Sequence, residues 1–225
     1  MGKAKNQKIC VFCGGSAKTR DHVPPKGIFP DPKPTDLITV PACASCNSKT
    51  KLDDEYFRWL VATGSGVDKR AHELIKDRIL PRFRSRSALL HEIMKGATHV
   101  DIHSEGGIYL GKQPAFHFDR FRVQTVIDKT VRGLYYVELG TMLPENAVVT
   151  NFILNPIFED EMKNVICSLP LKDIGNGIFS YRFWADDTMP EESFWLLMFF
   201  DKTLFLTKTE PNPSNSADAT SRAAD

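Results

Sequence analysis

The 225-residue sequence contains no run of about 18 consecutive apolar residues, the length that a membrane-spanning helix needs. It also lacks a basic start followed by an apolar run, so we expect no secretory signal, no membrane partner and a cytoplasmic location. No internal repeat is visible. Hydrophobic residues make up 42% of the chain and charged residues 25%, which is the balance of a globular protein rather than a disordered one.

Net charge is nearly absent, at +1, but the charges are unevenly distributed. Residues 1–98 carry 18 Lys and Arg against 10 Asp and Glu, whereas residues 99–225 carry 11 against 18. The first part is therefore basic (+8) and the second acidic (−7). This split favours a polyanionic partner such as nucleic acid for the basic part, and mutual attraction between the two parts explains it equally well.

Cysteine is scarce, and four of the five cysteines form two C-x2-C pairs, Cys10 with Cys13 and Cys43 with Cys46. Without a secretion signal, such pairs are typical of a metal site, because disulfides need an oxidising compartment. Four thiolates suit a structural Zn2+ and leave no open position for chemistry, while disulfide or redox use is the alternative. The fifth, Cys167, lies in an apolar run, and we expect it to be a buried packing residue.

The pattern of apolar residues predicts an α+β fold. Six prolines between the cysteine pairs exclude long regular structure there, and Pro81 should break or kink a later helix. The expected helices are 53–61, 67–80, 84–95 and 119–139. The expected strands are 99–104, 108–110, 115–118, 148–154, 178–185, 194–200 and 203–207, the last two as a hairpin.

The chain is expected to divide near residues 96–99. The expected domain organisation is a basic flexible N-terminus (1–9), a cysteine-containing module with basic helices (10–97), an acidic accessory domain of mixed α/β structure with antiparallel strands (98–210) and a disordered tail (211–225). The acidic domain could bind a regulatory protein or a second copy of the chain. Its negative charge would repel nucleic acid, so we do not expect it to lie along the substrate.

Between and beside the cysteine pairs lie Asp21, His22 and Asn47. One ion bound by both pairs would fix Cys46, and hence Asn47 one residue beyond it, so that a carboxylate, an imidazole and a carboxamide converge. Each residue also has an ordinary explanation. His22 could be structural or an alternate zinc ligand, and Asn47 could be a helix cap.

This arrangement resembles the HNH nuclease family, in which a β-hairpin and a helix grip one metal ion. The resemblance covers roughly residues 10–60 and rests on C-x2-C, Asp-His-x-Pro-Pro, and a second C-x2-C followed directly by Asn. It implies a zinc-stabilised ββα-metal module in which Asp21 and Asn47 hold a catalytic Mg2+ or Mn2+ and His22 is the general base. The family commonly has an Asn that orients the base. Asp36 is the nearest candidate here, and it could equally be a turn residue.

The residue types agree with phosphodiester hydrolysis. An imidazole with a pKa of about 6.5 can accept a proton from water near neutral pH. Carboxylate and amide oxygens are hard donors that suit Mg2+. A cation beside the phosphate neutralises charge on it and on the leaving oxygen.

Basic side chains that could contact phosphates follow the second cysteine pair and surround Pro81, although a solvated helix face explains the arginines as well. These candidates are Lys49, Lys51, Arg78, Arg82, Arg84 and Arg86. We therefore expect an HNH endonuclease that acts on DNA, with RNA as an open alternative, in bacterial anti-phage defence or mobile-element biology. The competing hypothesis is a catalytically inactive zinc-knuckle module that binds nucleic acid or another protein.

Overall fold

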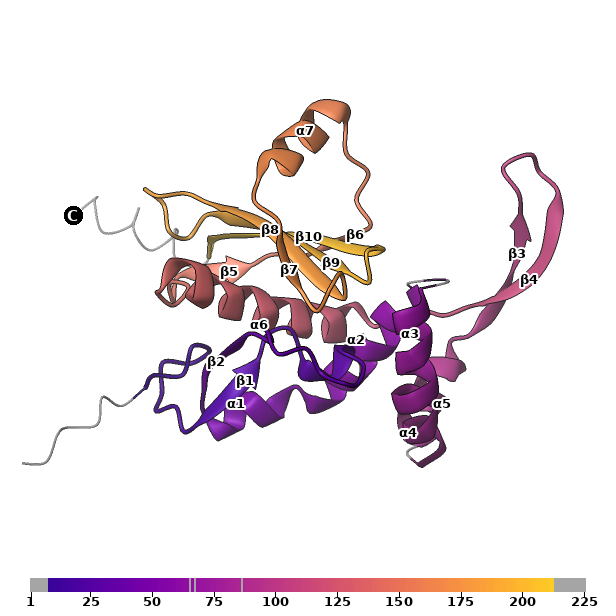
Figure 1. The fold of residues 1–225 in the computed structure, drawn as a ribbon, viewed down its shortest axis with the longest axis horizontal. Helices are drawn as coiled ribbons and strands as arrows, with labels where there is room; N and C mark the ends of the chain where they lie inside the picture. Colours follow the sequence, from indigo (N-terminus) through magenta and orange to yellow (C-terminus); the bar gives the residue numbers. More distant parts are fainter. Residues whose placement is uncertain (1–7, 65, 67, 86, 213–225) are drawn as a thin grey trace, which may run out of the picture.

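The computed structural model describes residues 8–64, 66, 68–85 and 87–212. Over these residues the chain has a mixed α+β fold with three antiparallel sheets. Helix α6 (Arg120–Leu139) lies between the largest sheet on one side and the N-terminal hairpin with helix α2 (Lys51–Gly64) on the other (Figure 1). In the described ranges, none of the helices is both long enough and apolar enough to cross a bilayer.

The N-terminal region has the order strand, strand, helix. Strand β1 (Thr19–His22) pairs antiparallel with β2 (Thr39–Ala42), and the connection contains the short 3-10 helix η1 (Lys26–Ile28). Strand β2 leads directly into α1 (Ala44–Lys49), which is followed by α2. The cysteine pairs flank this hairpin, one before β1 and the other at the start of α1.

A helical segment continues through Pro81 instead of breaking there. It comprises α3 (Lys69–Leu74), the π-helical turn η2 (Ile75–Ile79) and α4 (Leu80–Ser85), with α5 (Ser87–Lys95) following. The wider π turn ends at Ile79, two residues before Pro81, whose ring would clash with the carbonyl of the preceding turn in a regular α-helix. The expected break is thus a local change of helix type.

The second half builds a projecting ribbon, a long helix and the main sheet. The ribbon pairs β3 (Thr98–His103) with β4 (Tyr109–Ala115) and extends away from the body (Figure 1). The main sheet has the order β5-β10-β9-β8-β7, with β6 also paired to β10. Its strands are β5 (Ala147–Val149), β6 (Ile153–Leu154), β7 (Lys172–Ile174), β8 (Phe179–Ala185), β9 (Ser193–Phe199) and β10 (Thr203–Pro211).

Some predicted elements differ from the structure. The strand expected at 148–154 is two short strands, and 115–118 is no separate strand because Ala115 ends β4. Helix α7 (Asp160–Ser168) and strand β7 were not predicted. The expected burial of Cys167 is wrong: it is exposed on α7, where Ile166 is the residue that packs inward. Residues 1–7 and 213–225, which the predictions placed in flexible ends, lie outside the described ranges.

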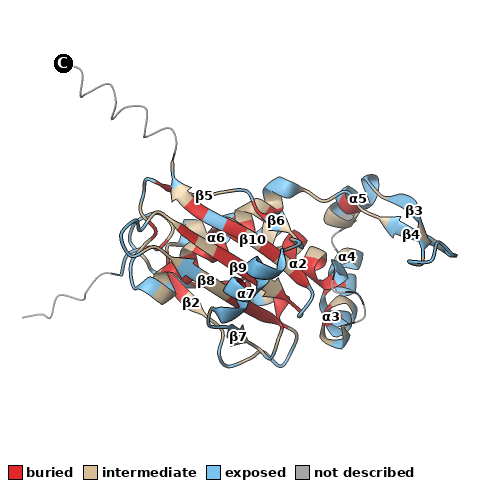
Figure 2. Cartoon of the chain, turned by 90° about the horizontal axis from the view of Figure 1, so that it is seen from above, coloured by how far each residue is buried: buried red, intermediate tan, exposed pale blue. Residues whose placement is uncertain are grey.

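One aromatic-rich core crosses the boundary expected near residues 96–99. Phe57 of α2 packs edge-on against Phe199 of β9, with ring centroids 5.1 Å apart, and also contacts Phe205 of β10. The same core continues through α6 and the central strands, whose buried residues appear in Figure 2. The basic and acidic parts therefore share their largest hydrophobic core.

Candidate functional site

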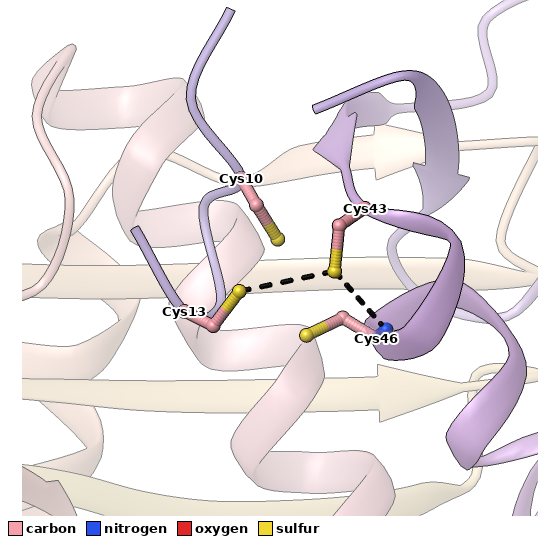
Figure 3. A group of neighbouring side chains, drawn as sticks. All are labelled: Cys10, Cys13, Cys43 and Cys46. Atoms are coloured by element: carbon pink, nitrogen blue, oxygen red, sulfur yellow. Dashed lines mark hydrogen bonds between the residues drawn. The ribbon is translucent and has the colours of Figure 1, made fainter. Parts of the chain in front are cut away.

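The four paired cysteines come together in space, as predicted. Their Sγ atoms all lie within 4.8 Å of one another, and Cys13 and Cys43 are 3.8 Å apart (Figure 3). Sulfurs bound about 2.3 Å from one tetrahedral Zn2+ lie about 3.8 Å from each other. The donor set and its spacing therefore fit a metal ion such as zinc.

Local backbone structure places each pair. The first is a tight turn in which Cys10 N donates to Gly15 O (2.7 Å) and Gly14 adopts a left-handed φ of 70° that favours glycine. In the second, Cys43 caps α1, and Cys46 N donates to its Sγ at 3.4 Å. This hydrogen bond lowers the pKa of the Cys43 thiol to about 7. At Cys43 the thiolate that a metal needs is thus accessible near neutral pH, whereas burial raises the pKa of the Cys46 thiol.

Asn47 contacts the strand that carries the Asp-His pair. Its Nδ2 donates to Arg20 O at 2.9 Å and to Thr19 Oγ1 at 3.2 Å. The amide orientation follows from these two acceptors, and among the described residues Oδ1 has no hydrogen-bond partner. Asn47 therefore lies beside β1 with a carbonyl oxygen free to bind a cation.

Asp21 lies on the same face of β1 as Thr19, because side chains alternate along a strand. It is 8% exposed. Its Oδ1 accepts a hydrogen bond from His22 N (2.9 Å), and its Oδ2 lies 2.8 Å from Nζ of Lys129 on α6. The same Nζ donates to Thr50 Oγ1 (2.7 Å) and lies 3.9 Å from Asp54 Oδ2.

We call Asp21, Thr50, Asp54 and Lys129 the buried polar cluster. Burial raises the pKa of Asp54 to about 6, while the Lys129 charge opposes that shift. Lys129 was not predicted as a site residue, and it lies 79 residues after Thr50 in the chain. The sequence did carry one indication of its role. Lys129 lies between Val126 and Val131, on the side of α6 where a core helix normally carries apolar residues.

His22 ends β1 and shares the opposite strand face with Arg20. It is half-buried, and burial together with the positive charge of Lys26 lowers the pKa of its imidazole below the ordinary value. The ring is therefore neutral at neutral pH. Immediately after it, Val23 packs against α6 so closely that a Cβ on Gly133 would lie 2.5 Å from Val23 Cγ1.

Among the described residues, no hydrogen bond links Asp36 to the His22 imidazole that it was expected to orient. Its Oδ2 accepts a hydrogen bond from Gly175 N at 3.2 Å, in the turn between β7 and β8. The carboxylate thus fastens the hairpin connection to the main sheet.

The predicted phosphate-contacting residues are spread over several elements. Lys49 and Lys51 are exposed where α1 meets α2, and Arg84 is exposed on α4. The exposed Arg78 and Arg82 form ion pairs with acidic side chains, Arg78 with Asp31 and Arg82 with Glu55. Arg86 lies outside the described residues.

Comparison with known proteins found no relative of this chain. No family model matches the chain, and neither the curated proteins nor the solved structures contain a significant match. The cysteine cluster and the contacts around Asp21, His22 and Asn47 are therefore the features that bear on function.

Proposed function

We propose that this chain is a metal-dependent endonuclease of the HNH type that hydrolyses phosphodiester bonds, with DNA as the first candidate substrate and RNA as the second. The observation that carries the proposal is the hydrogen bond from Asn47 Nδ2 to Arg20 O. It holds a helix carboxamide against the strand that bears Asp21 and His22, within the frame of the four cysteines. A purely binding knuckle has no need of these three residues together.

Asp21 and Asn47 supply the oxygen donors for a catalytic Mg2+ or Mn2+. Asn47 has a free Oδ1, the buried Asp54 Oδ1 accepts no hydrogen bond in the described structure, and Asp21 Oδ2 faces the Lys129 ammonium. Oxygens of this kind are hard donors that suit such ions. When bound, the ion would neutralise charge on the scissile phosphate and the leaving oxygen.

His22 would act as the general base. Its depressed pKa keeps the imidazole neutral at neutral pH, so it can accept the proton of a water that attacks the phosphorus. Although His22 and Asp21 occupy opposite faces of β1, the strand ends at His22. Both side chains can therefore serve one phosphate that approaches the end of the hairpin.

The cysteine-bound zinc is structural in this proposal, and basic side chains hold the substrate backbone. Lys49, Lys51 and Arg84 are exposed and have no ion-pair partner among the described residues, whereas Arg78 and Arg82 must leave Asp31 and Glu55 to bind phosphate. Contacts of this kind make binding weaker as salt concentration rises.

A plasmid-nicking assay with zinc-loaded protein and added Mg2+ tests the proposal. We expect nicking by the wild type and a loss of about 100-fold or more in His22→Ala, as when a general base is removed. His91→Ala is the matched control, because His91 is an exposed histidine on α5, and it should retain full activity. Equal activity in wild type and His22→Ala would refute the assigned base.

One observation favours a second candidate, a nucleic-acid-binding module without cleavage. The Asp21 carboxylate is already paired with the Lys129 ammonium, so its charge is balanced without a divalent ion. Salt-dependent DNA binding with no nicking at any Mg2+ or Mn2+ concentration would establish this alternative.

A further inference from the structure

Lys129 reaches the proposed catalytic residues from the other half of the chain. Helix α6 contributes it to the buried polar cluster, where its ammonium touches Asp21 Oδ2 at 2.8 Å and Thr50 Oγ1 at 2.7 Å. Lys129 is only 6% exposed, and its ammonium also lies over the ring of Phe12, 5.9 Å from the centroid. This ammonium is a cation held at the carboxylate that the proposed function assigns to a metal.

The cluster contains more carboxylate than one ammonium can satisfy. Asp21 Oδ2 and Asp54 Oδ1 are buried and accept no hydrogen bond, although Lys129 lies beside the first. With both carboxylates ionised, the two aspartates and the one lysine carry a net charge of −1. Such a site attracts a further cation, and the ammonium already present opposes it.

We propose that Lys129 competes with the divalent cation for Asp21, so that α6 sets the affinity of the site for metal. This inference rests on the proposed function. An ion about 2.1 Å from Asp21 Oδ2 would lie within about 5 Å of Nζ, because Nζ is itself 2.8 Å from that oxygen. Two positive charges so close together in a buried site repel each other strongly.

The backbone of α6 gives Lys129 little freedom to withdraw. One turn further along, Gly133 approaches Val23 so closely that no side chain fits between them. The neighbours Val126 and Thr130 are buried as well. Relief of the competition therefore requires Lys129 to change its side-chain conformation, and Lys129 acts as a positioning residue that keeps Asp21 paired.

Titration of zinc-loaded full-length protein with Mn2+ tests the proposal, with bound Mn2+ measured by electron paramagnetic resonance. Lys129→Met removes the ammonium and keeps much of the side-chain length, so it should bind Mn2+ at least tenfold more tightly than the wild type. Lys163→Met is the matched control, because Lys163 is an exposed lysine on α7 that pairs with Asp160 of the same helix. Its Mn2+ affinity should equal that of the wild type.

A second variant covers the case in which Lys129→Met fails to fold around two unpaired carboxylates. Lys129→Met combined with Asp54→Asn leaves only Asp21 ionised, so the cluster keeps the wild-type net charge. It should also bind Mn2+ at least tenfold more tightly than the wild type, and adding Asp21→Asn should abolish the gain. Wild-type affinity in the double variant, or a gain that survives Asp21→Asn, would overturn the competition.

The same titration separates this inference from the proposed function. If Asp21→Asn weakens Mn2+ binding but no Lys129 substitution alters it, the competition is wrong and the metal site stands. If Asp21→Asn changes Mn2+ affinity in no background, both the metal site and the competition fail.

Discussion

The N-terminal hairpin beside the cysteine cluster and the main sheet differ in how much hydrophobic side chain they bury. The N-terminal region has its own small buried cluster of three valines, Val11, Val23 and Val40, and its β1–β2 connection adds Ile28 and Phe29 to the main core. The main core contains most of the large aromatic side chains, including Trp195 and Phe205 at 0% exposure. The first region places the proposed chemistry, and the second gives the chain its hydrophobic stability.

This difference shows how little of the proposed site depends on hydrophobic burial. A fully buried aliphatic side chain contributes about 1.5–3 kcal/mol, so these few side chains offset only part of the cost of ordering a loop-rich hairpin. A structural Zn2+ bound by thiolates contributes about 10–16 kcal/mol in zinc-finger peptides at pH 7. The order of the hairpin should therefore depend on metal, and that of the sheet should not.

Loss of the proposed zinc should have the largest effect, and it should disorder the hairpin while the main sheet stays folded. We expect Cys43→Ser to lose zinc and to unfold residues 10–50 locally, because one of four ligands and the cap of α1 disappear together. Hydrogen exchange should show lost protection in β1 and β2, while β8 and β9 stay protected.

Cys167→Ser is the matched control for that experiment, since Cys167 is exposed and outside the cluster. It should keep the zinc content and the exchange pattern of the wild type. A Cys43→Ser protein with unchanged zinc content and a protected hairpin would contradict the four-cysteine assignment.

Truncation of the shared hydrophobic core should instead lower the free energy of unfolding without removing a metal ligand. Phe57→Ala removes a ring that packs on Phe199 and Phe205 and should lower the free energy of unfolding by about 3–5 kcal/mol. Zinc stoichiometry at low denaturant should not change, because no ligand is involved. Urea denaturation measures the loss, and Phe121→Ala, at an 86% exposed position on α6, should stay within about 0.5 kcal/mol of the wild type.

Features with a local cause could be predicted from the sequence. The cysteine cluster follows from thiolate chemistry at fixed spacing. The long helix follows from apolar periodicity between Asp119, which caps α6, and Gly140, which ends it in a left-handed conformation. The β9–β10 hairpin follows from two apolar runs around Asp201.

Features that depend on distant partners could not be predicted. Asp36 bonds to Gly175, 139 residues away, and no pattern near Asp36 indicates it. The pairing of Lys129 with Asp21 likewise needs α6 to lie against the hairpin. Helix α7 was missed because it is an exposed helix in which Ile166 is the buried residue.

Ion pairs cross between the basic and acidic parts in both directions. Arg70 of the basic part pairs with Asp201 of the acidic part at 3.0 Å, whereas Lys129 of the acidic part pairs with Asp21 of the basic part at 2.8 Å. These pairs do not decide between the two explanations of the charge split. Nucleic-acid binding by the basic part stays a prediction.

The smallest expected effect lies at the joint between the two regions, where α6 passes the hairpin. Gly133→Ala should add about 1 kcal/mol of helix propensity, but its Cβ would lie 2.5 Å from Val23 Cγ1. Overpacking of this kind usually costs about 1–3 kcal/mol, so we expect a net loss of up to about 2 kcal/mol in urea denaturation. In a Val23→Ala background both Cγ atoms are gone and the Cβ contact of 3.0 Å remains, so the same substitution should cost clearly less than in the wild type. An equal cost in both backgrounds would show that the close approach of α6 to the hairpin does not restrict residue 133.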